Sequence, residues 1–181
     1  MNRRSLAAFA TGLAGALAAG WLAFPRWLYV SADQPLPFNH RLHTSDATGF
    51  ACTDCHAIRA DGEFAGIPSV ATCATCHAEP VGTTAGEKRL VEEFVRPGRE
   101  IPWRVYSRQP DNVRFPHAAH VQGAQLACES CHGAHGTRET LVAFQEDRLS
   151  GYARGLITMD RCESCHRETG RGPLACIGCH R

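Results

Sequence analysis

Residues 128–132 read Cys-Glu-Ser-Cys-His, and this short stretch decides the fold. Two cysteines separated by two residues and followed directly by histidine form the attachment signature of c-type haem. The two thiols add across the haem vinyl groups, and the adjacent imidazole binds the iron. The pattern occurs five times and uses all ten cysteines, so we expect five covalently attached c-type haems. The predicted attachment residues are Cys52, Cys55, Cys73, Cys76, Cys128, Cys131, Cys162, Cys165, Cys176 and Cys179, with His56, His77, His132, His166 and His180 as proximal iron ligands.

The remaining histidines match the need for sixth ligands. The chain has ten histidines, and five are left after the proximal ones are assigned. Four of these form two copies of Phe-x-His-x-x-His, at residues 38–43 and 115–120. Two histidines three apart project from one side of a helical turn and can reach the irons of two different haems. The predicted distal ligands are His40, His43, His117, His120 and His135.

Zinc and disulfides are the ordinary alternatives for paired cysteines. Structural zinc sites close tetrahedrally and usually combine two such pairs. Five pairs do not divide in that way, and zinc does not require a histidine after each pair. Redox disulfides of the thioredoxin type occur singly on a βαβ pattern, which is not seen here. For the free histidines the alternative is an ordinary exposed side chain, and their number and spacing favour ligation.

An apolar N-terminal segment indicates the compartment. Residues 5–24 carry no charge and are long enough to span a hydrocarbon core as a helix. Trp21, Trp27 and Tyr29 cluster at the far end, where amphipathic aromatic side chains settle at a membrane interface. The two arginines at residues 3–4 keep the N-terminus cytoplasmic by the positive-inside rule. The segment therefore predicts that the rest of the chain is exported.

A cleaved signal peptide is the alternative reading of this segment, since its small residues offer a cleavage site. The apolar run is longer than a usual signal core, so we expect a retained single-pass anchor over residues 1–30 in the inner membrane, in contact with lipid. Haem attachment occurs outside the cytoplasm, so residues 31–181 are expected to form a periplasmic pentahaem domain. The formal net charge of +1 gives no indication of nucleic-acid binding.

The exported part is too short for a conventional core. Roughly 150 residues must house five haems, or about 30 per haem, so the porphyrins are expected to supply the core. The predicted fold is mostly irregular with short α-helices that carry the haem motifs. An internal repeat divides it into halves of about 38–77 and 115–180, each opening with the same histidine pair, joined by a connector over 78–114.

The connector contains the one longer helix that the sequence predicts. Thr84 and Glu87 have capping-box spacing, an apolar stripe follows at residues 90–95, and Pro97 ends the run. Beyond the helix, two aromatic residues could pack internally or against a partner. Five arginines could form a solvated face or dock an acidic partner. These residues are Trp103 and Tyr106, and Arg96, Arg99, Arg104, Arg108 and Arg114.

These motifs resemble known cytochromes. Phe-x-His-x-x-His followed by Cys-x-x-Cys-His is similar to the class III cytochrome c family, in which the two histidines serve different haems. Further segments resemble the multihaem cytochrome subunit shared by menaquinone reductase and alternative complex III. They are Pro-Phe-Asn-His at 37–40, Phe-Ala-Gly-Ile-Pro at 64–68, Ile-Pro-Trp at 101–103 and Phe-Pro-His-Ala-Ala-His at 115–120.

The resemblance implies an electron-transport role in a respiratory complex. It implies a membrane-anchored relay between a soluble periplasmic cytochrome c and the quinone-reactive complex, catalytic only together with integral membrane and iron–sulfur or molybdopterin-like subunits. Menaquinone reductase is the favoured version. Its cytochrome subunit is usually hexahaem, whereas five motifs stand here and match the pentahaem subunit of alternative complex III. A sixth haem would need an attachment that this sequence does not show.

Two other classes of protein share single features with this chain. An anchored tetrahaem quinol dehydrogenase places methionine two residues after an early motif histidine, but His56 is followed by Ala57 and Ile58. A multihaem reductase of small oxyanions needs an iron with a free position, against which the five surplus histidines argue. The order of the haems and the direction of electron flow do not follow from the sequence.

Overall fold

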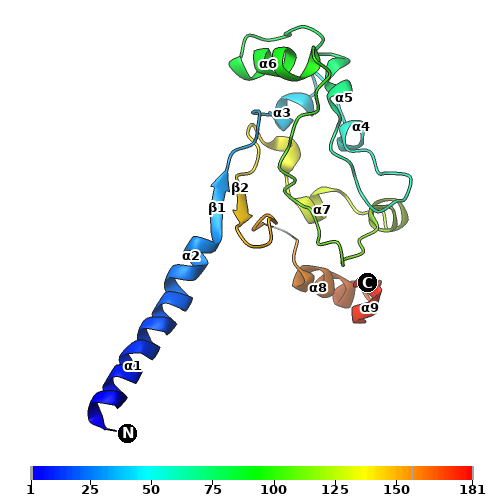
Figure 1. Ribbon diagram of the computed structural model, residues 1–181. Coiled ribbons are helices and arrows are strands. Elements are labelled where there is room, and N and C mark those ends of the chain that lie inside the picture. The colour runs from blue at the N-terminus through cyan, green and yellow to red at the C-terminus, as the bar shows by residue number, and fades with distance from the viewer. Residues whose placement is uncertain (1, 156, 181) are drawn as a thin grey trace.

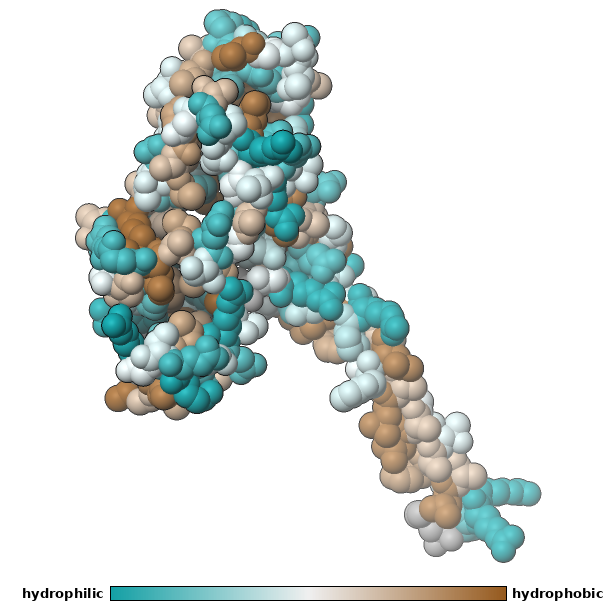
Figure 2. Space-filling view, turned by 180° about the vertical axis from the view of Figure 1, so that it is seen from behind, coloured by the Kyte–Doolittle hydropathy of each residue, from teal (hydrophilic) through white to brown (hydrophobic). Residues whose placement is uncertain are grey.

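A long N-terminal helix projects from the rest of the molecule in the computed structural model, which describes residues 2–155 and 157–180 (Figure 1). It runs through α1 (Arg3–Ala18), a π-helical turn η1 (Ala19–Ala23) and α2 (Phe24–Leu28) without interruption. Its 26 residues extend about 39 Å, more than the roughly 30 Å of a hydrocarbon core. None of its apolar stretch is buried, and brown apolar side chains run along the rod in Figure 2. By length and composition the helix is a candidate membrane anchor. A signal sequence would have the same length and composition.

A two-stranded sheet ties this helix to the body. Strand β1 (Tyr29–Ala32) pairs antiparallel with β2 (Phe144–Asp147), with Tyr29 opposite Asp147. Just after β2, the backbone N–H of Arg148 donates to the Leu28 carbonyl and its Nε donates to the Trp27 carbonyl, both at 2.8 Å. No local sequence pattern predicts this sheet, because its strands are short and far apart in the chain.

Short helices and irregular segments make up the body, as predicted. Glycines with positive φ, such as Gly133 (φ 76°) and Gly170 (φ 64°), end α7 and α8, because the left-handed region costs glycine little. The helices are α3 (His40–His43), α4 (Cys52–Cys55), α5 (Val70–Ala74), α6 (Ala85–Arg89), the π-helical η2 (Leu90–Val95) and η3 (Ala118–Gly123), α7 (Glu129–His132), the 3₁₀ turn η4 (His135–Thr137), α8 (Met159–Thr169) and α9 (Cys176–Cys179).

The polypeptide by itself supplies little core. Its accessible surface is 12798 Å², about one and a half times the roughly 8,600 Å² expected for a compact protein of this mass. Part of the excess is the projecting helix. Of the described residues, seven hydrophobic side chains are buried, and four of them form one cluster beside α5 and η2. The buried side chains are Leu36, Val70, Val91, Phe94, Ile101, Phe144 and Ala153.

The predicted connector helix is confirmed, with two differences. Thr84 is its N-cap, and the Thr84 hydroxyl accepts the Glu87 backbone N–H at 3.2 Å. The Glu87 side chain, however, does not complete a capping box, because both its oxygens bind elsewhere. The helix also changes to π-helical hydrogen bonding over Leu90–Val95, and the side chains of Val91 and Phe94 in this segment are buried.

The connector's aromatic and basic residues are engaged within the chain. Trp103 packs against the buried cluster, and the Tyr106 ring lies 6.1 Å from that of His135. Four of the arginines pair with nearby acids, and Arg99 instead stacks on an aromatic ring, which favours a solvated face over a docking surface. The partners are Glu79 for Arg96, Phe94 for Arg99, Glu146 for Arg104, Asp111 for Arg108 and Glu63 for Arg114.

Candidate haem-binding site

Each predicted attachment motif lies on or beside a short helix that holds its two thiols one turn apart. The motifs of Cys52 and Cys176 coincide with α4 and α9, those of Cys128 and Cys162 lie on α7 and α8, and that of Cys73 closes α5. No disulfide joins any of the ten cysteines. Among the described residues, no group of three or more histidine, cysteine or acidic side chains converges as a metal-ion site, so the zinc interpretation gains no support.

The structure brings four of the free histidines opposite four of the motif histidines. The ring centres of His40 and His56 are 6.4 Å apart, and those of His43 and His77 are 6.2 Å apart. The second half of the chain repeats this arrangement. There His117 faces His132 at 6.3 Å, and His120 faces His166 at 6.1 Å.

These separations fit imidazoles that share one iron. Two imidazoles on opposite sides of a metal ion have ring centres about 6.2 Å apart, because each metal–nitrogen bond is about 2.0 Å and each bonding nitrogen lies about 1.1 Å from its ring centre. Direct stacking of two rings would bring them closer, as the 4.4 Å between Phe115 and His120 illustrates. The donor set therefore fits bis-histidine iron at four of the five motifs.

In each Phe-x-His-x-x-His motif, the phenylalanine ring contacts both histidine rings. Phe115 stacks on His120 at 4.4 Å and meets His117 edge-on at 4.8 Å. Phe38 makes the same two contacts, stacked on His43 at 4.5 Å and edge-on to His40 at 4.8 Å. The aromatic residue that opens each motif thus fixes the rotation of both imidazoles.

Hydrogen bonds at Nδ1 orient most of these rings. When Nδ1–H donates a hydrogen bond, the lone pair of Nε2 is left for a metal. Backbone carbonyls accept from five of the rings, and a carboxylate accepts from one. The acceptors are Asn39 for His43 (2.8 Å), Gly66 for His56 (2.9 Å), Glu63 for His117 (2.7 Å), Pro116 for His120 (2.9 Å), Pro173 for His166 (2.9 Å) and the Glu87 carboxylate for His77 (2.9 Å).

His40 differs from the others. Its Nδ1 is buried and has no hydrogen-bond partner among residues 2–155 and 157–180. Burial, with smaller contributions from the neighbouring His56, His135 and His43, lowers the pKa of His40 to about 4. The ring is therefore neutral at physiological pH, the form that binds iron.

The fifth free histidine lies apart from the fifth motif. The His135 ring faces His40 at 6.3 Å with the planes 69° apart. The turn that carries it docks on α3, where the Thr44 hydroxyl donates to the Gly136 carbonyl at 2.6 Å and Arg41 pairs with Glu139. No ring contact joins His180 to a histidine within residues 2–155 and 157–180. The role of His135 as a distal ligand stays a prediction.

Contacts between neighbouring motifs give the five attachment sites an order. Burial raises the pKa of the Cys52 thiol, and hydrogen-bonded Cys128 raises it further, which joins the first motif to the third. Burial raises the pKa of the Cys73 thiol, and the nearby Cys55 thiol raises it further. Because Cys55 acts on Cys73, the second motif lies beside the first.

The same kind of contact connects the later motifs. Burial raises the pKa of the Cys162 thiol, and the thiols of Cys179 and Cys131 raise it further. Arg161, the residue before the fourth motif, donates to the Ser130 carbonyl of the third at 2.7 Å. These pairwise contacts link the motifs in the series second, first, third, fourth and fifth.

The sequence does not predict the part that Glu87 plays. The spacing of Glu87 from Thr84 predicts a helix cap, whereas the Glu87 carboxylate accepts a hydrogen bond from the His77 ring. Burial works to raise the pKa of Glu87, but hydrogen bonds from Val81, His77 and Gly82 outweigh it and leave the pKa lowered. The only sequence signal was an acidic residue ten positions after a motif histidine, which is too common to be diagnostic.

Comparisons with known proteins agree with this site. Residues 26–97 match the model of the class III cytochrome C family, and residues 113–181 match that of cytochrome c7 and related cytochrome c. Short helices, little sheet and covalent haem motifs define the class as a multihaem c-type cytochrome. The chain is 40% identical over 189 residues to the menaquinone reductase multiheme cytochrome c subunit of Nitratidesulfovibrio vulgaris (strain Hildenborough), an alignment that covers 97% of this chain and 90% of that protein. The chain belongs to the family of that cytochrome subunit.

Proposed function

We propose that this chain is the electron-relay subunit of a menaquinone reductase complex, held in the inner membrane by its N-terminal helix with a pentahaem domain over residues 31–181 in the periplasm. Electrons enter from a soluble periplasmic cytochrome c. They leave toward the quinone through partner subunits, some of the iron–sulfur or molybdopterin-like type and others integral to the membrane. When bound, the haems supply reversible one-electron chemistry between ferric and ferrous iron.

The observation that carries the proposal is the set of four opposed histidine pairs at 6.1–6.4 Å. An iron held by imidazole on both faces has no open position, so small substrates do not bind the metal. The residues are thus suited to transfer electrons and not to transform a substrate. The 40% identity to a menaquinone reductase subunit favours that complex over other electron-transfer partners.

The order of the attachment sites supports a relay with two ends. The Glu63 carbonyl, beside the first motif, accepts from His117 of the third site at 2.7 Å, so the two halves of the repeat meet there. The backbone N–H of Arg114 donates to the Cys179 carbonyl at 2.7 Å, which places the fifth motif beside the start of the second half. The sites of His77 and His180 would then be the ends through which electrons enter and leave.

Haem content and spin state test this function on the protein purified from membranes in detergent. Pyridine haemochrome assay should give five haems per chain. Low-temperature electron paramagnetic resonance should show low-spin ferric signals for at least four of them. A haem content well below five, or a high-spin signal from two or more haems, would contradict the proposal. Iron–sulfur and polytopic membrane subunits should co-purify with the chain.

The number of motifs favours a second candidate, the pentahaem subunit of alternative complex III, in which electrons flow from quinol to a periplasmic acceptor. Steady-state assays of the purified complex separate the two. Faster reduction of menaquinone by reduced periplasmic cytochrome c supports menaquinone reductase, whereas faster cytochrome reduction by menaquinol supports the alternative.

A further inference from the structure

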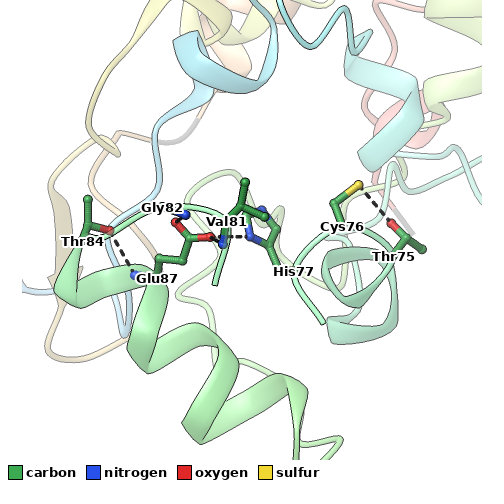
Figure 3. A network of polar contacts seen from close by, with 7 residues as sticks. All are labelled: Thr75, Cys76, His77, Val81, Gly82, Thr84 and Glu87. Carbon is green, nitrogen blue, oxygen red and sulfur yellow. Dashed lines mark hydrogen bonds and ion pairs between the residues drawn. The ribbon is translucent and has the colours of Figure 1, made fainter. Parts of the chain in front are cut away.

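The His77 ring has a partner unlike those of the other candidate ligands. Its Nδ1 lies 2.9 Å from Glu87 Oε1, and the two side chains are only 23% and 16% exposed (Figure 3). The rings of His43, His56, His117, His120 and His166 all donate to neutral backbone carbonyls. Among the described residues, His77 is the one candidate ligand that is hydrogen-bonded to a carboxylate.

The carboxylate is held in place by the backbone around it. Val81 N–H donates to Oε1 at 2.6 Å, and Gly82 N–H donates to Oε2 at 2.9 Å (Figure 3). A Cβ on residue 82 would lie 2.7 Å from Oε2, so glycine is needed for this approach. At the helix start, Thr84 caps the N–H of Glu87. The carboxylate is therefore preorganised toward His77 and not a mobile surface group.

A carboxylate changes what the imidazole gives to a metal. Hydrogen bonds from a ring N–H to a carboxylate are charge-assisted and stronger than those to a carbonyl. They pull the Nδ1 proton away and make Nε2 a stronger electron donor. A stronger axial donor stabilises ferric iron more than ferrous iron, and axial ligands with their hydrogen bonds are the main protein control on haem potential.

We infer that Glu87 is a positioning residue that gives the haem of Cys73, Cys76 and His77 the lowest reduction potential of the set. The inference rests on the proposed function, because it requires His77 to bind haem iron. The site is also the terminal one in the order of attachment sites. A low potential at an end of the relay favours electrons leaving it toward the interior.

Glu87→Gln tests this inference on the full-length chain in its purified complex. The amide oxygen can still accept from His77, but the negative charge is lost. In a spectroelectrochemical titration the equilibrium constant for reducing the lowest-potential haem should rise at least tenfold. Its reduction potential should therefore rise by at least about 59 mV, the value of a tenfold change for one electron. Glu87→Asp, which keeps the charge on a shorter side chain, should fall between the wild type and the glutamine variant.

Glu93→Gln is the matched control. Glu93 lies in η2, directly after α6, carries the same charge and pairs with Arg89 at 3.0 Å, with no contact to a candidate ligand. Its removal should shift each component by less than twofold. If Glu87→Gln with wild-type haem content and wild-type low-spin signals leaves every component unmoved, or if Glu93→Gln moves them equally, the inference is overturned while the relay function stands.

A second measurement covers a variant that does not mature. In Cys73→Ala/Cys76→Ala the second haem is not attached, and the lowest-potential component should disappear from the titration. Loss of a different component would overturn the inference. Failure of the proposed function looks different, since the wild-type protein would then lack the low-spin bis-histidine signals before any variant is made.

Discussion

At the scale of single residues, the candidate site depends on the orientation of imidazoles. Spacing three apart in the sequence places His117 and His120 on one turn, but it does not choose their partners. The choice comes from Phe115, whose ring contacts both imidazoles, and from the carbonyls of Glu63 and Pro116, which accept hydrogen bonds from Nδ1–H. Each ring is thereby left with Nε2 free before any iron is bound.

Removing the aromatic spacer should therefore affect two haems at once. In Phe115→Ala, His117 and His120 lose the ring that fixes their rotation, so part of both haems should become high-spin in electron paramagnetic resonance. Stability should fall by about 2 kcal/mol, less than the roughly 3–5 kcal/mol of a fully buried phenylalanine, because Phe115 is half-buried. Phe50→Ala, at a 38% exposed position whose ring contacts no histidine ring among the described residues, should leave the low-spin spectrum unchanged. An unchanged low-spin spectrum in Phe115→Ala would contradict the role of the spacer.

At the scale of elements, local patterns predicted well and distant pairings did not. The cap at Thr84 and the short helices around the motifs follow from a few neighbouring residues. The β1–β2 sheet joins segments far apart in the chain, and no local pattern signals it. The same limit applies to the facing of His120 and His166, which depends on the whole chain path. The change from α- to π-helix at Leu90 also has no sequence signal that we recognise.

The helix cap gives a prediction at this scale. In Thr84→Ala the N–H of Glu87 loses its acceptor, which should cost about 0.5–2 kcal/mol of stability. Hydrogen exchange of the amides at residues 85–89 should become faster as the first turn frays. Thr83→Ala, one position before the cap, should leave exchange at the wild-type rate. Equal effects of the two substitutions would show that the cap does not stabilise α6.

At the scale of the whole molecule, the attachment sites run between two ends. The lobe of α5 and α6, with the His77 site, lies farthest from the N-terminus, and α8 and α9 lie closer to the level of α2 (Figure 1). If the N-terminal helix spans the membrane, the His77 end is the one presented to soluble donors. Tuning by Glu87 and the position of this end would then favour the same direction of electron flow, inward from the periplasm.

The last prediction concerns the C-terminal end of the N-terminal helix, where it joins the body. Arg148 lies over Trp27 at 5.5 Å and Arg154 over Tyr29 at 4.9 Å, so two cations from the distant β2 region stand where the apolar helix ends. Such residues should bind the phosphates of anionic phospholipids, each contributing about 1 kcal/mol near a charged membrane surface.

In Arg148→Gln/Arg154→Gln, phosphatidylglycerol that co-purifies in detergent should therefore bind about 30-fold more weakly, since 1.4 kcal/mol corresponds to tenfold. Quantitative lipid mass spectrometry over a salt series measures this loss. Arg89→Gln/Arg96→Gln, at the lobe of α6 and η2, removes the same charge far from the anchor and should retain wild-type lipid. Equal retention in both double variants would mean that the anchor is held by its apolar helix without help from these arginines.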